Sequence, residues 1–136
     1  MFKLDSRLEK DTIHLTAWPL CEVLLVNDTQ FPWVILVPKV SGATELYHLD
    51  PVQRQQLDAE SVHLSKVLMA VYSGDKLNVA ALGNVVSQLH IHHVVRFEAD
   101  AVWPAPVWGK LAATPLNEQE LAEHKAKLFE LTNPKW

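Results

Sequence analysis

Two runs of branched apolar residues, separated by a polar segment, lie in the first third of the chain. Residues 21–26 read CEVLLV and residues 33–37 read WVILV, and the segment between them holds Asn27, Asp28 and Pro32. Such runs predict strands, and turn-forming residues predict the connection between them. Pro38 ends the second run because proline cannot continue a paired strand. We therefore expect an antiparallel hairpin.

A long helix is predicted after this hairpin. Asp50 suits the N-cap, Pro51 suits the first helical position, and Gln53 stands where a capping box needs an amide. The run Ser73-Gly74-Asp75 ends the helix. The apolar stripe at helical spacing consists of Leu57, Val62 (or Ser61), Leu64, Leu68 and Val71.

The second half of the chain predicts two more strands and a second helix. Residues 77–82 and 89–97 have strand character, with a turn at Gly83-Asn84 between them. Asn117 begins a second capping box, which predicts a C-terminal helix that reaches about Leu131. At least four strands with two helices make an α+β fold. The 136 residues are typical of one domain, which we expect to span 1–136.

Composition and charge exclude several classes of protein. Hydrophobic residues make up 49% and charged residues 21%, which is typical of a globular protein and not of a disordered one. The single Cys21 excludes an internal disulfide framework. The N-terminus lacks the apolar core of a signal peptide, and no apolar run suits a membrane span, so we expect a cytoplasmic protein with no membrane partner. The net charge of −4 argues against nucleic-acid binding but leaves small phosphorylated ligands open.

Histidines are concentrated in the last predicted strand. Three of the seven histidines are His90, His92 and His93. Because alternate residues of a strand share a face, Gln88, His90 and His92 should line up on one side, with His93 on the other. A row of polar side chains is costly to bury without partners, so we expect this row to line a pocket.

Three interpretations of this row compete. A polar solvent face is disfavoured, because such faces usually carry Lys, Glu and Thr. A metal site would need a third ligand, and the candidates His14, His48 and His63 have no supporting spacing. The third interpretation is nucleophilic catalysis on phosphorus by an imidazole, with a second histidine and an amide in support.

The run from Gln88 to Val94 resembles the histidine triad signature, His-φ-His-φ-His-φ-φ, in which φ is apolar. Residues 23–28 and 32–39 resemble the nucleotide-binding hairpin of that family. The resemblance covers roughly residues 2–110. It applies in particular to a bacterial branch of histidine triad hydrolases that has glutamine at the first position of the motif.

The resemblance implies a fold, an activity and partners. The fold would be an antiparallel sheet of about five strands with one long helix, and the chain would form a homodimer. The activity would be hydrolysis or transfer at the α-phosphate of a nucleotide conjugate through a covalent nucleotidyl-histidine. No metal or other cofactor is expected. The leaving group and the base preference stay open.

The resemblance also implies site residues. His90 would be the nucleophile, His92 would hydrogen-bond the α-phosphate, and Gln88 would take the place of the first histidine. The substrate-binding residues would be Asn27 at the ribose and Asn78, Gly83 and Asn84 near the phosphates.

Two residues depart from the family pattern. Gln88 can orient a neighbour but cannot exchange a proton near neutral pH, which argues against a proton relay through this position. Trp33 stands where several relatives have another histidine, and we expect it to fill the core. Because both residues alter the pocket, the alternative function is a nucleotide-binding regulatory module with little or no turnover.

Overall fold

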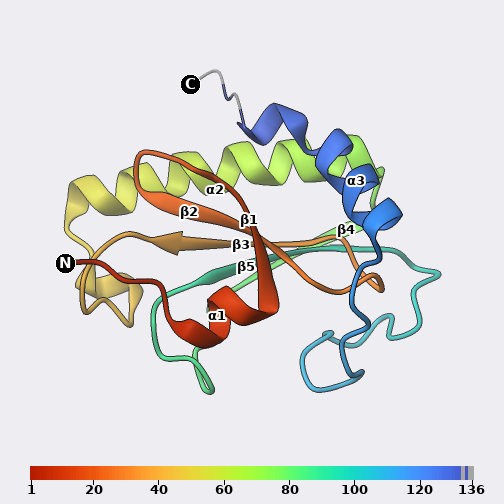
Figure 1. Cartoon of the computed structure of the whole chain (residues 1–136). Coiled ribbons are helices and arrows are strands. Elements are labelled where there is room, and N and C mark those ends of the chain that lie inside the picture. The colour runs from red at the N-terminus through yellow and green to blue at the C-terminus, as the bar shows by residue number, and fades with distance from the viewer. Residues whose placement is uncertain (133, 135–136) are drawn as a thin grey trace.

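The computed structural model describes residues 1–132 and 134, and its centre is a five-stranded antiparallel sheet in the order β1-β2-β3-β5-β4 (Figure 1). The fold is α+β, as predicted. The elements are α1 (Ser6–Asp11), β1 (Thr12–Ala17), β2 (Cys21–Val26), β3 (Trp33–Pro38), η1 (Leu46–His48), α2 (Pro51–Tyr72), β4 (Lys76–Ala80), β5 (Ile91–Arg96), α3 (Glu118–Lys127) and η2 (Phe129–Thr132). The elements α1 and β1 were not predicted.

The hairpin β2–β3 and the helix α2 form where the sequence predicts them. Leu24 pairs with Ile35 across the hairpin. At the start of α2, the Asp50 carboxylate accepts the Gln53 backbone N–H at 2.8 Å, and Gln53 Oε1 accepts the Asp50 N–H at 2.9 Å. Ser61 rather than Val62 faces the sheet, since Val62 is 44% exposed. The capping box and the burial of one helix face therefore account for the position of α2.

The other boundaries shift by a few residues. The strand β5 begins at Ile91 instead of residue 89, and β4 covers 76–80 instead of 77–82. The C-terminal helix α3 ends at Lys127, and the chain continues as the short helix η2. There the buried Leu131 accepts the Trp18 indole N–H on its backbone oxygen at 2.8 Å. This docking replaces the last turns of a regular helix.

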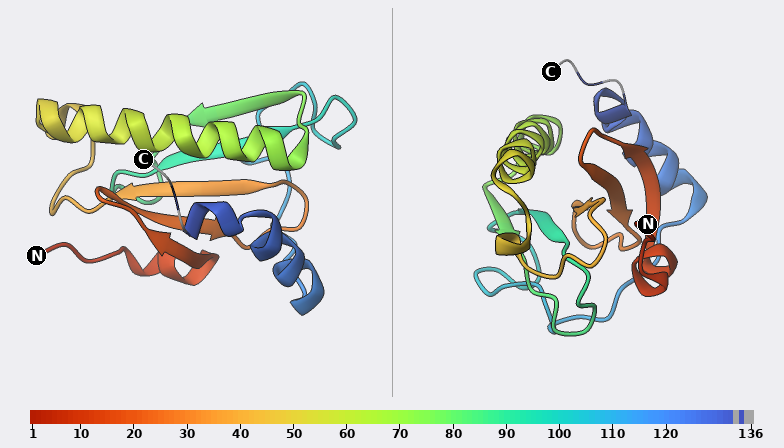
Figure 2. Two further views of the ribbon diagram at one scale, coloured as in Figure 1. Left: turned by 90° about the horizontal axis from the view of Figure 1, so that it is seen from above. Right: turned by 90° about the vertical axis from the view of Figure 1, so that its left-hand side faces the viewer.

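Both faces of the sheet are covered, by different parts of the chain (Figure 2). The helix α2 and the residues Leu128 and Leu131 pack on one face. The opposite face packs against Leu8 of α1, Val86 and Val107. Among the described residues, no helix is both long enough and apolar enough to cross a membrane.

A buried ion pair anchors the loop that follows β5. The Arg96 guanidinium donates to the Asp100 carboxylate at 2.8 and 3.0 Å, and both side chains are almost fully buried. The same carboxylate accepts the backbone N–H groups of Val102 and Trp103. These bonds, that from Arg96 above all, hold the pKa of Asp100 far below its usual range. The Arg96–Asp100 pair thereby fixes the start of the loop that leads to Trp108.

Candidate active site

His90 and His92 lie together on the sheet face that points away from α2. His90 immediately precedes β5, and His92 lies within it. Their ring centroids are 4.8 Å apart, and the two residues are 6% and 8% exposed. On the same face, β5 pairs His92 with Ile35 of β3 and with Ala80 of β4. The predicted pairing of the two histidines on one face is therefore present.

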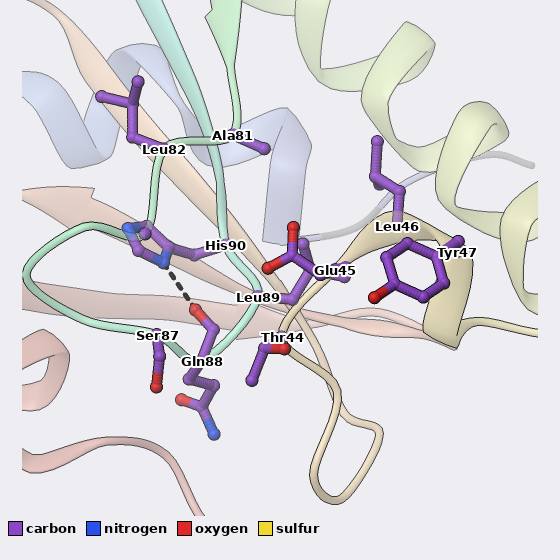
Figure 3. A pocket seen from close by; sticks show the side chains of 11 residues that line it. Thr44, Glu45, Leu46, Tyr47, Ala81, Leu82, Ser87, Gln88, Leu89 and His90 are labelled. Atoms are coloured by element: carbon purple, nitrogen blue, oxygen red, sulfur yellow. Dashed lines mark hydrogen bonds between the residues drawn. The ribbon is translucent and has the colours of Figure 1, made fainter.

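The hydrogen bond of His90 determines which ring nitrogen carries the proton. Its Nδ1 lies 2.7 Å from the backbone oxygen of Gln88 (Figure 3). A carbonyl oxygen only accepts, so Nδ1 must carry the proton and donate. The Nε2 atom of the neutral ring is then left with a lone pair. His90 is thus in the tautomer that a nucleophilic imidazole requires.

His92 has the opposite tautomer. The indole Nε1–H of Trp33 donates to His92 Nδ1 at 3.0 Å. An indole nitrogen cannot accept, so Nδ1 of His92 is unprotonated and the proton of the neutral ring is on Nε2. Burial, together with the neighbouring His90 and His93 rings, lowers the pKa of His92 to about 3. With both rings neutral, the site therefore combines one lone pair, on His90, with one N–H donor, on His92.

Trp33 was predicted to fill the core, and its contacts go beyond packing. It lies half-buried with its ring centroid 6.1 Å from that of Trp108 and 5.6 Å from that of His92. Its bond to His92 depends on the pairing of β3 with β5. Trp33 therefore contributes a polar group to the site as well as apolar surface.

The side chain of Gln88 points away from the His90 ring (Figure 3). Its Oε1 accepts the backbone N–H of Asp5 at 2.8 Å, and its Nε2 donates to the backbone oxygen of Lys3 at 2.8 Å. The side-chain amide of Gln88 bonds to the backbone on both sides of Leu4, in the way that one residue of a parallel neighbouring strand would. Gln88 thus ties the N-terminal segment to the loop, and only its backbone oxygen bonds to His90.

His93 occupies the other face, as predicted. It is fully buried; its Nε2 lies 2.7 Å from the Ser61 hydroxyl of α2, and its Nδ1 lies 3.1 Å from the Ile91 oxygen. That oxygen requires the proton on Nδ1, so the Ser61 hydroxyl donates to Nε2. Burial lowers the pKa of His93 to about 4. This bond links the strand of the histidines to the long helix.

A test of this buried histidine is the dependence of stability on pH. The unfolded chain binds a proton at His93 near pH 6.5, whereas the folded protein does so only near pH 4. Above pH 6.5 neither state binds this proton, and the free energy of unfolding does not depend on it. As the pH falls from 6.5 toward 4, the unfolded state is favoured, and the free energy of unfolding decreases by up to roughly 3 kcal/mol. Urea unfolding of wild type and His93→Gln from pH 7 to 4 should show a shallower decline for the variant. Parallel curves would contradict a neutral His93 in the fold.

Two pockets flank the histidine pair. A pocket of about 330 Å³ lies beside His90 and is lined by residues 44–47, 81–83 and 87–90 (Figure 3). A pocket of about 500 Å³ lies on the tryptophan side and is lined by Asn27, Asp28, Trp33 and Trp108, among others. Since Trp33 and Trp108 both contact the His92 ring, the histidine pair lies between the two pockets.

The predicted binding residues are only partly gathered at these pockets. Asn27 lines the larger pocket, and its Oδ1 accepts the Leu116 backbone N–H at 2.9 Å. Gly83 lines the smaller pocket with φ of 77°, a conformation that favours glycine. Asn84 is exposed in the same turn and lines neither pocket. Asn78 also lines neither pocket, and its Oδ1 accepts from the Arg96 guanidinium at 2.9 Å.

Two residues of the larger pocket were not predicted as site residues. Asp28 is buried, and its Oδ1 accepts the backbone N–H groups of Gln30 and Thr114 at 3.0 and 3.3 Å. The ring of Trp108 lies 5.3 Å from that of His92. The aromatic character of the 103–109 loop was visible in the sequence, but which tryptophan reaches the histidines depends on how the loop folds.

The metal interpretation has no ligand set in the part of the chain that the structure describes. No three His, Cys, Asp or Glu side chains come close enough there to hold an ion. The candidate third ligands make other contacts. His14 pairs with Glu22 at 2.6 Å, His48 accepts the Thr44 N–H, and His63 packs edge-on against Trp18.

Comparison with known proteins agrees with this geometry. A family model described as the HIT domain matches residues 7–99. A histidine triad protein from Marinobacter aquaeolei VT8 is 53% identical, with a TM-score of 0.95, over 97% of this chain and 96% of that chain. A histidine triad protein from Bradyrhizobium japonicum is 40% identical, with a TM-score of 0.93, over 96% of this chain and 98% of that one.

A third similar structure is also that of a histidine triad protein. The histidine triad (HIT) protein from Sinorhizobium meliloti 1021 is 39% identical, with a TM-score of 0.92, over 96% of each chain. Among curated proteins, none matches the chain. The family model and these structures identify the chain as a member of the histidine triad family.

Proposed function

We propose that the protein cleaves nucleotide conjugates at the α-phosphorus through a covalent nucleotidyl intermediate on His90. The observation that carries the proposal is the pair of opposite tautomers. The Gln88 oxygen keeps the proton on Nδ1 of His90, and Trp33 keeps Nδ1 of His92 bare. One ring thus offers a lone pair while its neighbour offers an N–H for a phosphoryl oxygen.

The reaction proceeds in two displacements. Nε2 of His90 forms a bond to the α-phosphorus, and the bond from phosphorus to the leaving group breaks with its electron pair. Water then attacks the phosphorus and the bond to Nε2 breaks, which returns the lone pair to His90. One hydrogen of the water stays on the nucleoside monophosphate, and the other is released as a proton. The Nε2–H of His92 stabilises charge on the non-bridging oxygens in both steps.

The two pockets suit the two parts of such a substrate. In this proposal the larger pocket holds the nucleoside, because Trp33 and Trp108 offer aromatic surface and Asn27 and Asp28 offer polar groups. The smaller pocket beside His90 holds the leaving group. An in-line attack places Nε2 and the leaving group on opposite sides of the phosphorus, with the nucleoside oxygen between them, so the nucleoside and the leaving group extend from the phosphorus in different directions.

The proposal is tested by release of nucleotide and by direct detection of the intermediate. The protein is incubated with an acyl-adenylate, diadenosine polyphosphate and adenosine 5′-phosphoramidate in separate reactions, with and without EDTA. We expect AMP from at least one conjugate, unaffected by EDTA. Rapid quenching in alkali, followed by mass spectrometry, should place one adenylyl group on the peptide that contains His90.

The same experiment decides between the enzyme and a regulatory binding module. A module would bind AMP, as measured by calorimetry, yet give neither product nor an adenylylated peptide. That outcome would refute the proposed enzyme. The engaged side chain of Gln88 does not by itself favour the module, because the backbone oxygen of this residue still orients His90.

We propose that Gln88 is a positioning residue. Its side chain fixes the loop whose backbone oxygen orients His90, so a small displacement of that oxygen should slow the reaction. We expect Gln88→Ala to lower kcat for AMP release by about 10- to 100-fold with little change in KM. Lys3→Ala is the matched control, because only the backbone oxygen of Lys3 is used, and it should behave as wild type. Equal kinetics for Gln88→Ala and wild type would contradict this role.

We propose that the protein forms a homodimer through the edge of the sheet at β4. β4 pairs with β5 on one side, and its outer edge has no partner strand among the described residues. Val79 of β4 is 49% exposed and lines a pocket together with Leu46, which is 47% exposed. Light scattering should give twice the mass of the chain, and Val79→Lys should shift the distribution toward the monomer. A monomeric wild type would contradict the proposal.

A further inference from the structure

The bond between Trp33 and His92 limits the chemistry of the second histidine. An imidazole near neutral pH delivers a proton only from its doubly protonated form. To reach that form, His92 must gain a proton at Nδ1. This lone pair already accepts the Trp33 indole N–H at 3.0 Å, and the indole cannot reverse the bond because it has no acceptor. A protonated Nδ1 would face another N–H.

The surroundings of His92 also oppose its protonation. Its ring is buried between Trp33 on β3, Trp108 in the loop after β5, and His90. When the His90 nitrogen bonds to phosphorus, that ring becomes cationic and opposes a second positive charge 4.8 Å away. His92 therefore remains neutral during the attack and donates a hydrogen bond without giving up its proton.

Other groups at the pockets are not arranged to protonate a leaving group. Beside the smaller pocket, the backbone oxygen of Glu45 accepts the His48 N–H at 3.0 Å, and Tyr47 is 77% exposed. The Glu45 side chain lines the pocket, where a carboxylate only accepts hydrogen bonds. At the larger pocket, Asp28 accepts backbone N–H groups. The other titratable residues that line this pocket are Lys10 and Asp11. They lie at the proposed nucleoside site and not at the proposed leaving-group site. Gln88, the first residue of the motif, has no ionisable group.

We infer that Trp33 is a specificity-determining residue that restricts this site to leaving groups able to depart as stable anions. Carboxylates and phosphates meet this condition, so the substrates are mixed anhydrides such as acyl-adenylates or dinucleoside polyphosphates. Amines and alcohols need a proton as they leave, and conjugates of these groups are poor substrates. This inference rests on the proposed function of His90.

A series of adenosine 5′-aryl phosphates tests the inference. The phenols differ in acidity but little in shape, and single-turnover rates of phenol release report the chemical step. Without protonation, negative charge develops fully on the leaving oxygen, so the wild-type rate should fall steeply, by roughly tenfold for each unit of phenol pKa. The acyl-adenylate should react at least about 100-fold faster than adenosine 5′-phosphoramidate.

Trp33→Phe is the informative variant, since it keeps an aromatic ring and removes the N–H. With Nδ1 free, His92 can take up a proton, so the slope against phenol pKa should become shallower and the slow substrates should gain rate as the pH is lowered. Trp108→Phe is the matched control, because the Trp108 indole nitrogen donates to no described residue. It should change all rates by one common factor and leave the slope unaltered.

A measurement without substrate covers the case in which a variant is inactive. Nitrogen NMR of the His92 ring should show the Nε2–H tautomer in wild type and no titration above about pH 4. In Trp33→Phe, the ring should titrate at higher pH. A shallow wild-type slope, or a slope and titration unchanged in Trp33→Phe, overturns the inference. If no conjugate releases AMP and no adenylylated peptide forms, the proposed function itself fails.

Discussion

Replacing His90 with alanine should lower the rate of AMP release by about 10⁴-fold or more, because no other described group at the site offers a lone pair positioned for attack. Binding of AMP should be retained, since the larger pocket and His92 are untouched. The adenylylated peptide should be absent from the quenched variant. Single-turnover kinetics and calorimetry measure the two quantities separately.

The control for this experiment is an exposed histidine outside both pockets. His14→Ala removes an imidazole that lies 2.6 Å from the Glu22 carboxylate on the surface of β1. Its kinetics should stay within a few-fold of wild type. A loss of less than about tenfold in His90→Ala would show that another nucleophile or a directly attacking water carries the reaction.

The largest expected effect on stability follows from breaking the ion pair of Arg96 and Asp100. Arg96→Met should lower the free energy of unfolding by about 3–5 kcal/mol, because it leaves a buried carboxylate without its cation. The variant also loses the contacts of the guanidinium with the Phe31 and Trp103 rings, at 5.8 and 5.7 Å. Urea unfolding at pH 7, where the carboxylate is ionised, measures the change.

A double-mutant cycle separates the ion pair from these ring contacts. Asp100→Asn alone removes the charge but keeps an acceptor for some of the backbone N–H groups. If the pair matters, Arg96→Met combined with Asp100→Asn should cost less than the sum of the two single changes. Strict additivity, or a loss below about 1 kcal/mol in Arg96→Met, would show that the loop is held by other contacts.

Elements marked by local signals were predictable from the sequence. The capping residues Asp50 and Gln53 and the stop at Ser73 bound α2 within one residue, because these groups bond to nearby backbone. The strand β1 carries no comparable signal. It is half-exposed and is defined by its pairing with β2, which brings together residues such as Ile13 and Leu25. Contacts of this kind are not encoded within a short window.

The sequence predicted which side chains share the site, but it did not predict where the strand begins or which distant residues bond to those side chains. Period-two alternation put His90 and His92 on one face, but it also extended the alternation to Gln88, one residue before the predicted strand. Since β5 begins at Ile91, Gln88 lies in a loop, where its side chain is free to bind the N-terminal segment. The bond from Trp33 to His92 and that from Arg96 to Asn78 depend on the pairing of strands far apart in the sequence.

The backbone around His92 is held by more hydrogen bonds than the backbone around His90. His92 belongs to β5, whose six residues are buried and which pairs with β3 on one side and β4 on the other. His90 belongs to the segment before it, which is held by the bonds of Gln88 and by one bond from the Leu89 N–H to the Ala43 oxygen. Amide hydrogens in β5 should therefore exchange with solvent only on global unfolding, whereas those of residues 83–88 should exchange through local opening. Such an opening would displace His90, while His92 would keep its place in a strand whose six residues are all buried.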